Sequence, residues 1–216
     1  MPNLEVETYD IIVYMKIAII GAGNLGKALA EQFIKSGHEV YFGVKNVTEK
    51  NSEISGVKIL SIQEAALLAE VIIPAIPATA AVEVAHEIGS GKNKILLDPT
   101  NALRGAPEGY SDAYSAFKAL LPDIEIAKAF NSSGFENLSS LSYDGVRADF
   151  FVAGGSQKAK DVASYLAKEI GFGEIYDFGG DDKVGLLEQF AFAWINLAIM
   201  QKYGRDIAFK ILKHSK

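Results

Sequence analysis

Short apolar runs alternate with amphipathic segments along most of this chain. The first run, Lys16–Ile20, has the continuous apolar character of a strand that is buried on both faces. The segment after it, Asn24–Lys35, places its apolar residues on one stripe and predicts an amphipathic helix that ends at Gly37. The same reasoning predicts further strands at residues 39–43, 57–60, 71–76, 95–97, 125–130, 150–153 and 174–178.

Polar residues mark the starts of several predicted helices. Ser61 and Glu64 match a capping box in front of a helix that reaches about residue 69. Thr79 is the expected N-cap of the next helix, after Pro77 has stopped the fourth strand. Ser156 is expected to cap a later helix, which continues through residue 170.

The second half of the chain contains a long loop and a long helix. Residues 102–113 are rich in Gly, Pro and Ser and predict a loop, followed by a helix at residues 114–121. Residues 183–203 predict one long helix with a short helical end after it. This helix is apolar nearly all round, so it must be buried, either in the core or between two subunits.

Strands that are separated by helices pair in parallel through right-handed crossovers. The expected fold class is therefore α/β: a Rossmann-type, doubly wound, mostly parallel sheet with a long C-terminal helix. The length of 216 residues fits a single domain, which we assign to residues 15–216. We interpret residues 1–14 as an N-terminal extension, although residues 10–14 could also form an edge strand.

Composition and charge exclude several classes of protein. The net charge of −6 argues against a nucleic-acid partner. The chain has no cysteine and only three, widely spaced histidines, so we expect neither thiolate catalysis nor a metal site. The most apolar stretch, residues 190–200, is shorter than the roughly 20 residues of a membrane span. We therefore expect a cytoplasmic protein without a membrane partner.

A glycine-rich turn gives the sharpest functional signal. Gly21, Gly23 and Gly26 form a G-x-G-x-x-G motif that directly follows a predicted strand and opens a predicted helix. In this context the first glycine allows a tight turn, the second lets the backbone approach a diphosphate, and the third lets helix and strand pack closely. The helix start, which includes Asn24 and Leu25, offers free N–H groups to phosphates.

Residues at the end of the second predicted strand determine whether a site of this kind prefers NAD or NADP. An NAD site has an Asp or Glu there, which holds the ribose hydroxyls. This chain has Val44, Lys45 and Asn46, with no carboxylate, and Lys45 could meet a 2′-phosphate. The sequence therefore favours NADP(H), with the alternative that Lys45 is an ordinary solvated lysine.

Other strand ends should line the same crevice, because ligands of open α/β sheets bind at the carboxyl ends of the strands. Asn101 and Asn131 are candidates for ligand contact, although asparagine also commonly shapes turns. Pro77 is expected to shape the chain beneath the nicotinamide without a polar contact. The strand-end pairs are Ile76–Pro77, Thr100–Asn101, Phe130–Asn131 and Gly154–Gly155.

Several motifs in one order resemble the family of F420-dependent NADP oxidoreductases. The motifs are GAGNLG at residues 21–26, DPTN at 98–101, KAFN at 128–131, FVAG at 151–154, LE at 187–188 and WI at 194–195. The resemblance covers about residues 15–200, and the reductase domain of the STEAP metalloreductases is similar in outline.

This resemblance implies hydride exchange between NADP(H) and a flavin or deazaflavin, with FMN, FAD or coenzyme F420 as the co-substrate. It implies that the glycine turn and Lys45 hold NADP. It also implies that the nicotinamide is surrounded by Ile76, Pro77, Ala129, Phe130 and Asn131. The chain departs from the family at residues 44–46, where members commonly carry Ser-Arg-Arg, and residues 181–183 make the approach to the last helix longer.

Hydride passage between two flat rings needs positioning more than an acid or a base, so no catalytic residue is assigned. A second interpretation is an imine or hydroxyacid reductase whose substrate site is completed by dimerisation. A third is an NAD(P)-binding redox sensor without turnover. We also expect a homodimer with the long C-terminal helix at its interface.

Overall fold

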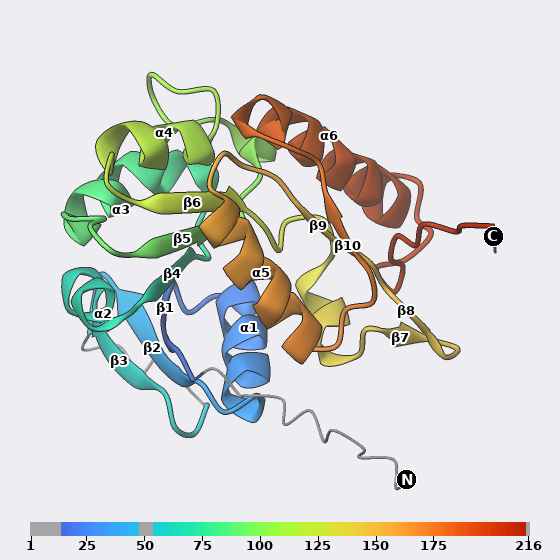
Figure 1. Cartoon of the computed structure of the whole chain (residues 1–216), viewed down its shortest axis with the longest axis horizontal. Helices are drawn as coiled ribbons and strands as arrows, with labels where there is room; N and C mark the ends of the chain where they lie inside the picture. The colour runs from blue at the N-terminus through green and yellow to red at the C-terminus, as the bar shows by residue number, and fades with distance from the viewer. Residues whose placement is uncertain (1–13, 48–53, 215–216) are drawn as a thin grey trace, which may run out of the picture.

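A parallel sheet of six strands organises the molecule, in the order β3-β2-β1-β4-β5-β6. In the computed structural model, which describes residues 14–47 and 54–214, the chain adds strands in one direction from β1 to β3 and in the opposite direction from β4 to β6, so the strand order reverses between β1 and β4 (Figure 1). This point is where an open α/β sheet places its ligand crevice. The six strands are β1 Lys16–Ile20, β2 Glu39–Val44, β3 Lys58–Ser61, β4 Val71–Pro74, β5 Ile95–Asp98 and β6 Glu125–Lys128.

Helices cover both faces of the sheet. Figure 1 shows α1 and α5 side by side over one face, and α2, α3 and α4 together on the other side. The helices are α1 Asn24–Lys35, α2 Ile62–Leu68, α3 Ala81–Ile88, α4 Ala113–Leu120, α5 Gln157–Glu169 and α6 Val184–Ile195. Short 3-10 turns are η1 Ala78–Ala80, η2 Ala102–Arg104, η3 Phe135–Ser139 and η4 Asp181–Lys183, and η5 Asn196–Met200 continues α6 as a π-helical turn.

The alternation of side chains along each strand divides the core in two. In β1, Ile17 and Ile19 point into the cluster under α1 and α5, while Ala18 and Ile20 point into the cluster under α2, α3 and α4. All four side chains are buried, which explains the unbroken apolar run in the sequence. The predicted Rossmann-type, doubly wound α/β fold is confirmed.

Two further strands extend the arrangement beyond β6. β9 Phe150–Val152 pairs in parallel with β10 Ile175–Asp177. A single antiparallel bridge between Lys128 and Ala153 connects β9 to the end of β6. The description "mostly parallel" therefore holds.

A small hairpin was missed by the sequence analysis. β7 Ser142–Tyr143 and β8 Val146–Arg147 are antiparallel and are joined by Asp144 and Gly145, both with positive φ. An Asp-Gly pair in this conformation is a strong hairpin signal, but the two strands are too short to show an apolar pattern.

The predicted helix caps were right at two positions and wrong at one. Ser61 and Glu64 form the expected capping box of α2, and Ser156 Oγ accepts the backbone N–H of Ala159 at 3.1 Å. Thr79 does not cap α3, because Pro77 starts the 3-10 turn η1 and Thr79 lies inside that turn.

Two predicted strands end earlier than the apolar pattern indicates. β4 stops at Pro74, where the missing N–H ends the ladder and Ala75 N–H turns back to the carbonyl of Ile73 at 3.0 Å. β6 stops at Lys128, since Phe130 has a φ of +60° that no strand residue adopts. The apolar residues after these points therefore shape loops at the edge of the sheet.

The C-terminal helix differs from its prediction in length and in burial. It ends at Met200, because Lys202 and Gly204 have positive φ, and the described residues after it form no helix. It is not buried all round: one face packs on the molecule, while Leu186, Phe192, Leu197, Ile199 and Met200 are exposed. The continuous helical run Asp181–Met200 has 20 residues and a mean hydropathy of 1.2, so length alone does not exclude a membrane span, contrary to the sequence estimate.

The predicted N-terminal extension, residues 1–14, lies outside the described residues except for residue 14, so that prediction is not tested.

Candidate functional site

The glycine turn has the geometry that its motif requires. Gly21 has a φ of +104°, and a Cβ there would lie 2.6 Å from the carbonyl oxygen of Ala75. A Cβ on Gly26 would clash with the carbonyl oxygen of Gly21. Around Gly23, by contrast, a Cβ would meet no atom within 4 Å. The turn is thus closed by protein on two sides and open at its middle glycine.

The open side coincides with the N-terminus of α1. Gly23 is the N-cap of this helix, and the first helical bond runs from Lys27 N–H to the Gly23 carbonyl at 2.9 Å. The backbone N–H groups of residues 24–26, in the first turn of α1, therefore have no hydrogen-bond partner within the helix. Free amides, the positive end of a helix and open space beside a glycine together fit a dinucleotide diphosphate.

The end of β2 places Lys45 in an ion pair. Val44 is buried, whereas Lys45 and Asn46 are exposed. Lys45 Nζ lies 2.6 Å from Glu83 Oε2, which comes from α3, and both side chains are more than half exposed. Lys45 can therefore meet a 2′-phosphate, but only in competition with a neighbouring carboxylate that repels the phosphate.

This pair predicts a change in cofactor preference. The variant Glu83→Gln is expected to bind NADPH about 3- to 10-fold more tightly, since it removes a charge that repels the 2′-phosphate and frees Lys45. The affinity for NADH should change less than twofold in this variant, because NADH has no 2′-phosphate. The variant Lys45→Glu should weaken the binding of NADPH but not that of NADH. Dissociation constants for both dinucleotides check this, and equal changes for NADPH and NADH would contradict it.

A cavity of about 270 Å³ lies at the carboxyl ends of β5 and β6, between α1 and α6. It brings together four residues that the sequence nominated, Leu25, Asn101, Phe130 and Asn131. Its other lining residues are Pro99, Arg104, Ser133, Gly134, Phe135, Trp194, Ile195, Ile199 and Arg205. Leu25 links this cavity to the glycine turn, because it lies in the first turn of α1.

The remaining nominated residues lie elsewhere. Ile76 packs next to Gly21, and Pro77 is exposed at the start of η1. Ala129 has no exposed surface and belongs to the core under α1 and α5, so its side chain does not reach the cavity.

Asn101 and Asn131 form a reciprocal pair at the base of the cavity. Asn101 Nδ2 donates to the backbone carbonyl of Asn131, and Asn131 Nδ2 donates to Asn101 Oδ1, both at 3.0 Å. Asn131 is only 5% exposed, and its Oδ1 has no hydrogen-bond partner among the described residues. A buried amide oxygen without a donor is costly, so this atom fits the N–H of a bound carboxamide or lactam.

A buried ionic triad, which the sequence analysis missed, lies behind the cavity. Lys128 Nζ is 3.0 Å from Asp98 Oδ2 and 2.5 Å from Glu188 Oε1, and Lys128 and Asp98 are completely buried. Burial alone lowers the pKa of the Lys128 ammonium, but the two carboxylates outweigh it and hold that pKa above its usual value. Lys128 is therefore charged.

The triad anchors the loop that forms one wall of the cavity. Asp98 Oδ1 accepts the N–H of Thr100 at 2.9 Å, and Glu188 Oε2 accepts the N–H of Ala102 at 3.2 Å. Because Glu188 lies on α6, the triad ties this helix to the ends of β5 and β6. All three charged residues lie within motifs that carried the family resemblance, but their spacing in sequence gave no sign that they meet.

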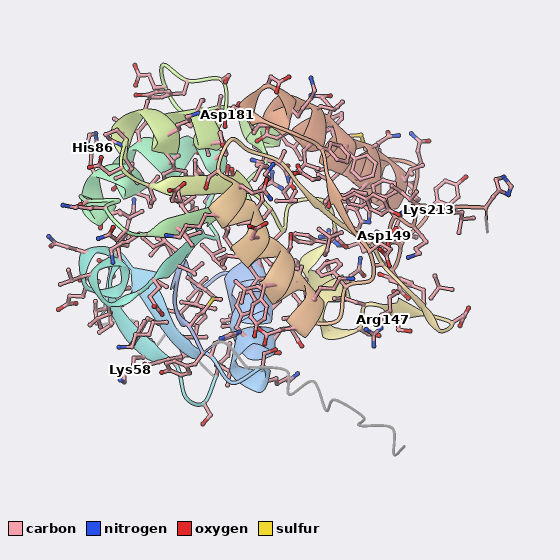
Figure 2. All side chains as sticks on the ribbon, in the orientation of Figure 1. Lys58, His86, Arg147, Asp149, Asp181 and Lys213 are labelled. Atoms are coloured by element: carbon pink, nitrogen blue, oxygen red, sulfur yellow. The ribbon has the colours of Figure 1, made fainter. Side chains whose placement is uncertain are left out.

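The histidines lie away from this site. His38 is buried, with Nε2 2.7 Å from Glu169 Oε2 of α5, which indicates a structural role. His86 points outward on α3 (Figure 2). That no residue acts as a catalytic acid or base stays a prediction.

The fold and the glycine site define an NAD(P)-dependent oxidoreductase of the Rossmann type. More specifically, residues 16–102 match the family described as NADP oxidoreductase, coenzyme F420-dependent, so the nucleotide-binding segment of the chain is similar to that family. The resemblance found in the sequence is thereby confirmed.

Solved structures show the same fold over most of the chain. A candidate F420-dependent NADP reductase from Arthrobacter sp. FB24 is 21% identical, with a TM-score of 0.79 over 92% of this chain and 100% of its own. The hypothetical protein SMa0349 from Sinorhizobium meliloti is 23% identical, with a TM-score of 0.68 over 93% of this chain and 96% of its own. An imine reductase from Streptomyces aurantiacus is 18% identical, with a TM-score of 0.64, and the match covers 87% of this chain but 63% of the reductase.

Proposed function

We propose that this protein transfers a hydride between NADP(H) and a flat, flavin-like acceptor such as FMN, FAD or coenzyme F420. The observation that carries the proposal is the cavity beside the glycine turn, which has aromatic and aliphatic walls and one unpartnered amide oxygen, on Asn131. Apolar walls with a few convergent polar groups are typical of sites for planar ligands. The family match supports NADP as one of the two partners.

The chain's own residues hold and shield the reacting rings. The first turn of α1 binds the diphosphate, and Asn131 Oδ1 accepts the carboxamide N–H of the nicotinamide. Phe130 and Trp194 wall the cavity and exclude water from the reacting face. The bound dihydronicotinamide supplies the hydride, so the protein needs only to position the acceptor.

Steady consumption of NADPH tests this proposal. Purified protein is mixed with NADPH and FMN, FAD or coenzyme F420 in turn, and the absorbance of the dihydronicotinamide is followed. Multiple turnovers with at least one acceptor are expected. Tight NADPH binding without turnover on any acceptor would instead favour a redox sensor.

An imine or hydroxyacid reductase is the second candidate, because the fold also matches the imine reductases. The chain spans 63% of the Streptomyces enzyme, so a comparable substrate site would need a second subunit. NADPH consumption with a cyclic imine but with none of the flavins would favour this candidate.

We further propose a homodimer that covers the exposed face of α6. Leu186 and Phe192 are 55% and 38% exposed, on the side of the helix that does not pack on its own chain. Covering several large apolar side chains is favourable by about 25 cal/mol per Å². Light scattering should give about twice the chain mass of 23.3 kDa, and the double variant Leu186→Glu, Phe192→Glu should give that of one chain. A monomeric wild type at micromolar concentration would contradict the proposal.

A further inference from the structure

Arginine side chains are concentrated in the lining of this cavity. The sequence has three arginines, Arg104, Arg147 and Arg205, and two of them line this cavity. No carboxylate lies among the residues that line it, in a chain whose net charge is −6. The lining of the cavity therefore offers two guanidinium groups to an anionic ligand, although the charge of Arg205 is partly balanced by Glu136.

Arg205 is held in place by contacts to η3, and the chain after it is tied to α6. Its Nε lies 2.5 Å from Glu136 Oε1, and its guanidinium lies over the Phe135 ring, 5.7 Å from the centroid. The chain just after it is tied to α6, because Trp194 Nε1 donates to the carbonyl of Ile207 at 2.7 Å. The contact to Glu136 uses Nε, so the terminal N–H groups remain for a ligand.

Arg104 faces the same cavity without an ion pair or hydrogen bond from the described residues. It ends η2, the turn whose first N–H, on Ala102, is fixed by Glu188 of the buried triad. The turn that carries Arg104 is therefore anchored at its first residue, while the exposed guanidinium of Arg104 is available to a ligand. A guanidinium in this state suits a carboxylate or phosphate, which it binds through two parallel hydrogen bonds.

We propose that Arg104, with Arg205, binds an acidic group attached to the planar acceptor, so that the site selects acceptors carrying a phosphate or carboxylate over the same ring without one. The inference rests on the proposed function. The reaction is NADPH plus oxidised acceptor plus H⁺ giving NADP⁺ plus the reduced acceptor: the hydride carries two electrons, and solvent supplies the proton. The acidic group takes no part in this chemistry and serves recognition alone.

A comparison of FMN with riboflavin distinguishes recognition of the charged group from recognition of the ring, because the two flavins differ only in the terminal phosphate. Trp194 is the only tryptophan of the chain and lines the cavity, so its fluorescence reports binding directly. Each flavin is titrated into the protein in the presence of NADP⁺, which allows binding without turnover. The variants are Arg104→Gln and Arg205→Gln, with Arg147→Gln as the matched control, since Arg147 lies in the β7–β8 hairpin and does not line this cavity (Figure 2).

Wild-type protein is expected to bind FMN at least about tenfold more tightly than riboflavin, the size of effect that a charged hydrogen bond produces. Arg104→Gln should remove most of that difference, Arg205→Gln should reduce it, and Arg147→Gln should preserve it. Riboflavin binding should be the same in all four proteins.

Equal affinities for FMN and riboflavin in the wild type would overturn the inference, as would an unchanged ratio in Arg104→Gln. It would also fail if Arg104→Gln weakened NADP⁺ binding instead, because the arginine would then belong to the dinucleotide site. These binding results do not depend on turnover. A protein that binds FMN selectively yet never oxidises NADPH would refute the proposed function and leave this inference standing.

Discussion

Replacing Gly23 with aspartate is expected to weaken NADPH binding about a hundredfold or more, which corresponds to about 2.7 kcal/mol. A Cβ at this position meets no protein atom within 4 Å, so the variant is expected to fold. Gly23 has a φ of −75°, which any residue adopts, and aspartate is a favoured N-cap that should stabilise α1. The new carboxylate, however, takes the first-turn N–H groups and the space that the diphosphate needs.

Calorimetric titration with NADPH measures this loss, and thermal unfolding without ligand shows that the fold is kept. Gly23→Ala is the matched control, because it adds the Cβ without the charge. Its affinity for NADPH should lie between that of the wild type and that of Gly23→Asp. If Gly23→Asp bound NADPH as the wild type does, the diphosphate would not lie at this turn.

The second large effect is expected at the buried triad, where Lys128→Met should lower the free energy of unfolding by about 3–5 kcal/mol. The substitution leaves Asp98 and Glu188 facing each other in the interior without their cation. It also loosens the loop that Asp98 and Glu188 hold through Thr100 and Ala102. Urea denaturation followed by circular dichroism measures the change.

An exposed lysine in an ion pair supplies the control. Lys118 pairs with Asp181 at the surface, and Lys118→Met should cost less than about 1 kcal/mol, as exposed pairs do. Adding Asp98→Asn and Glu188→Gln to Lys128→Met should recover part of the loss, since the unpaired charges disappear. A Lys128→Met variant no less stable than Lys118→Met would show that the triad does not carry this energy.

Much of the fold could be predicted from the sequence because the signals are local. The buried runs, the glycine turn and the caps Ser61 and Ser156 depend on neighbours a few residues away. The errors arose where a distant or backbone feature decided the outcome. Phe130 continues an apolar run but leaves the strand through its positive φ, and α6 looks buried by composition although one face is exposed.

The site was predictable in part. The cavity unites Leu25, Asn101, Phe130 and Asn131, each nominated as the end of a strand or the start of a helix. Arg104 and the ion pair of Lys45 with Glu83 could not be anticipated, because side chains from separate elements meet only in the folded chain.

A crystal structure of the protein with NADP⁺ bound would show whether the dinucleotide lies at the glycine turn and faces the cavity. We expect the diphosphate against Gly23 and the first turn of α1, and the nicotinamide carboxamide within hydrogen-bond distance of Asn131 Oδ1. We also expect the reactive face of the nicotinamide ring to open into the cavity between Phe130 and Trp194. A dinucleotide bound elsewhere, or a nicotinamide whose reactive face is covered by protein, would contradict it.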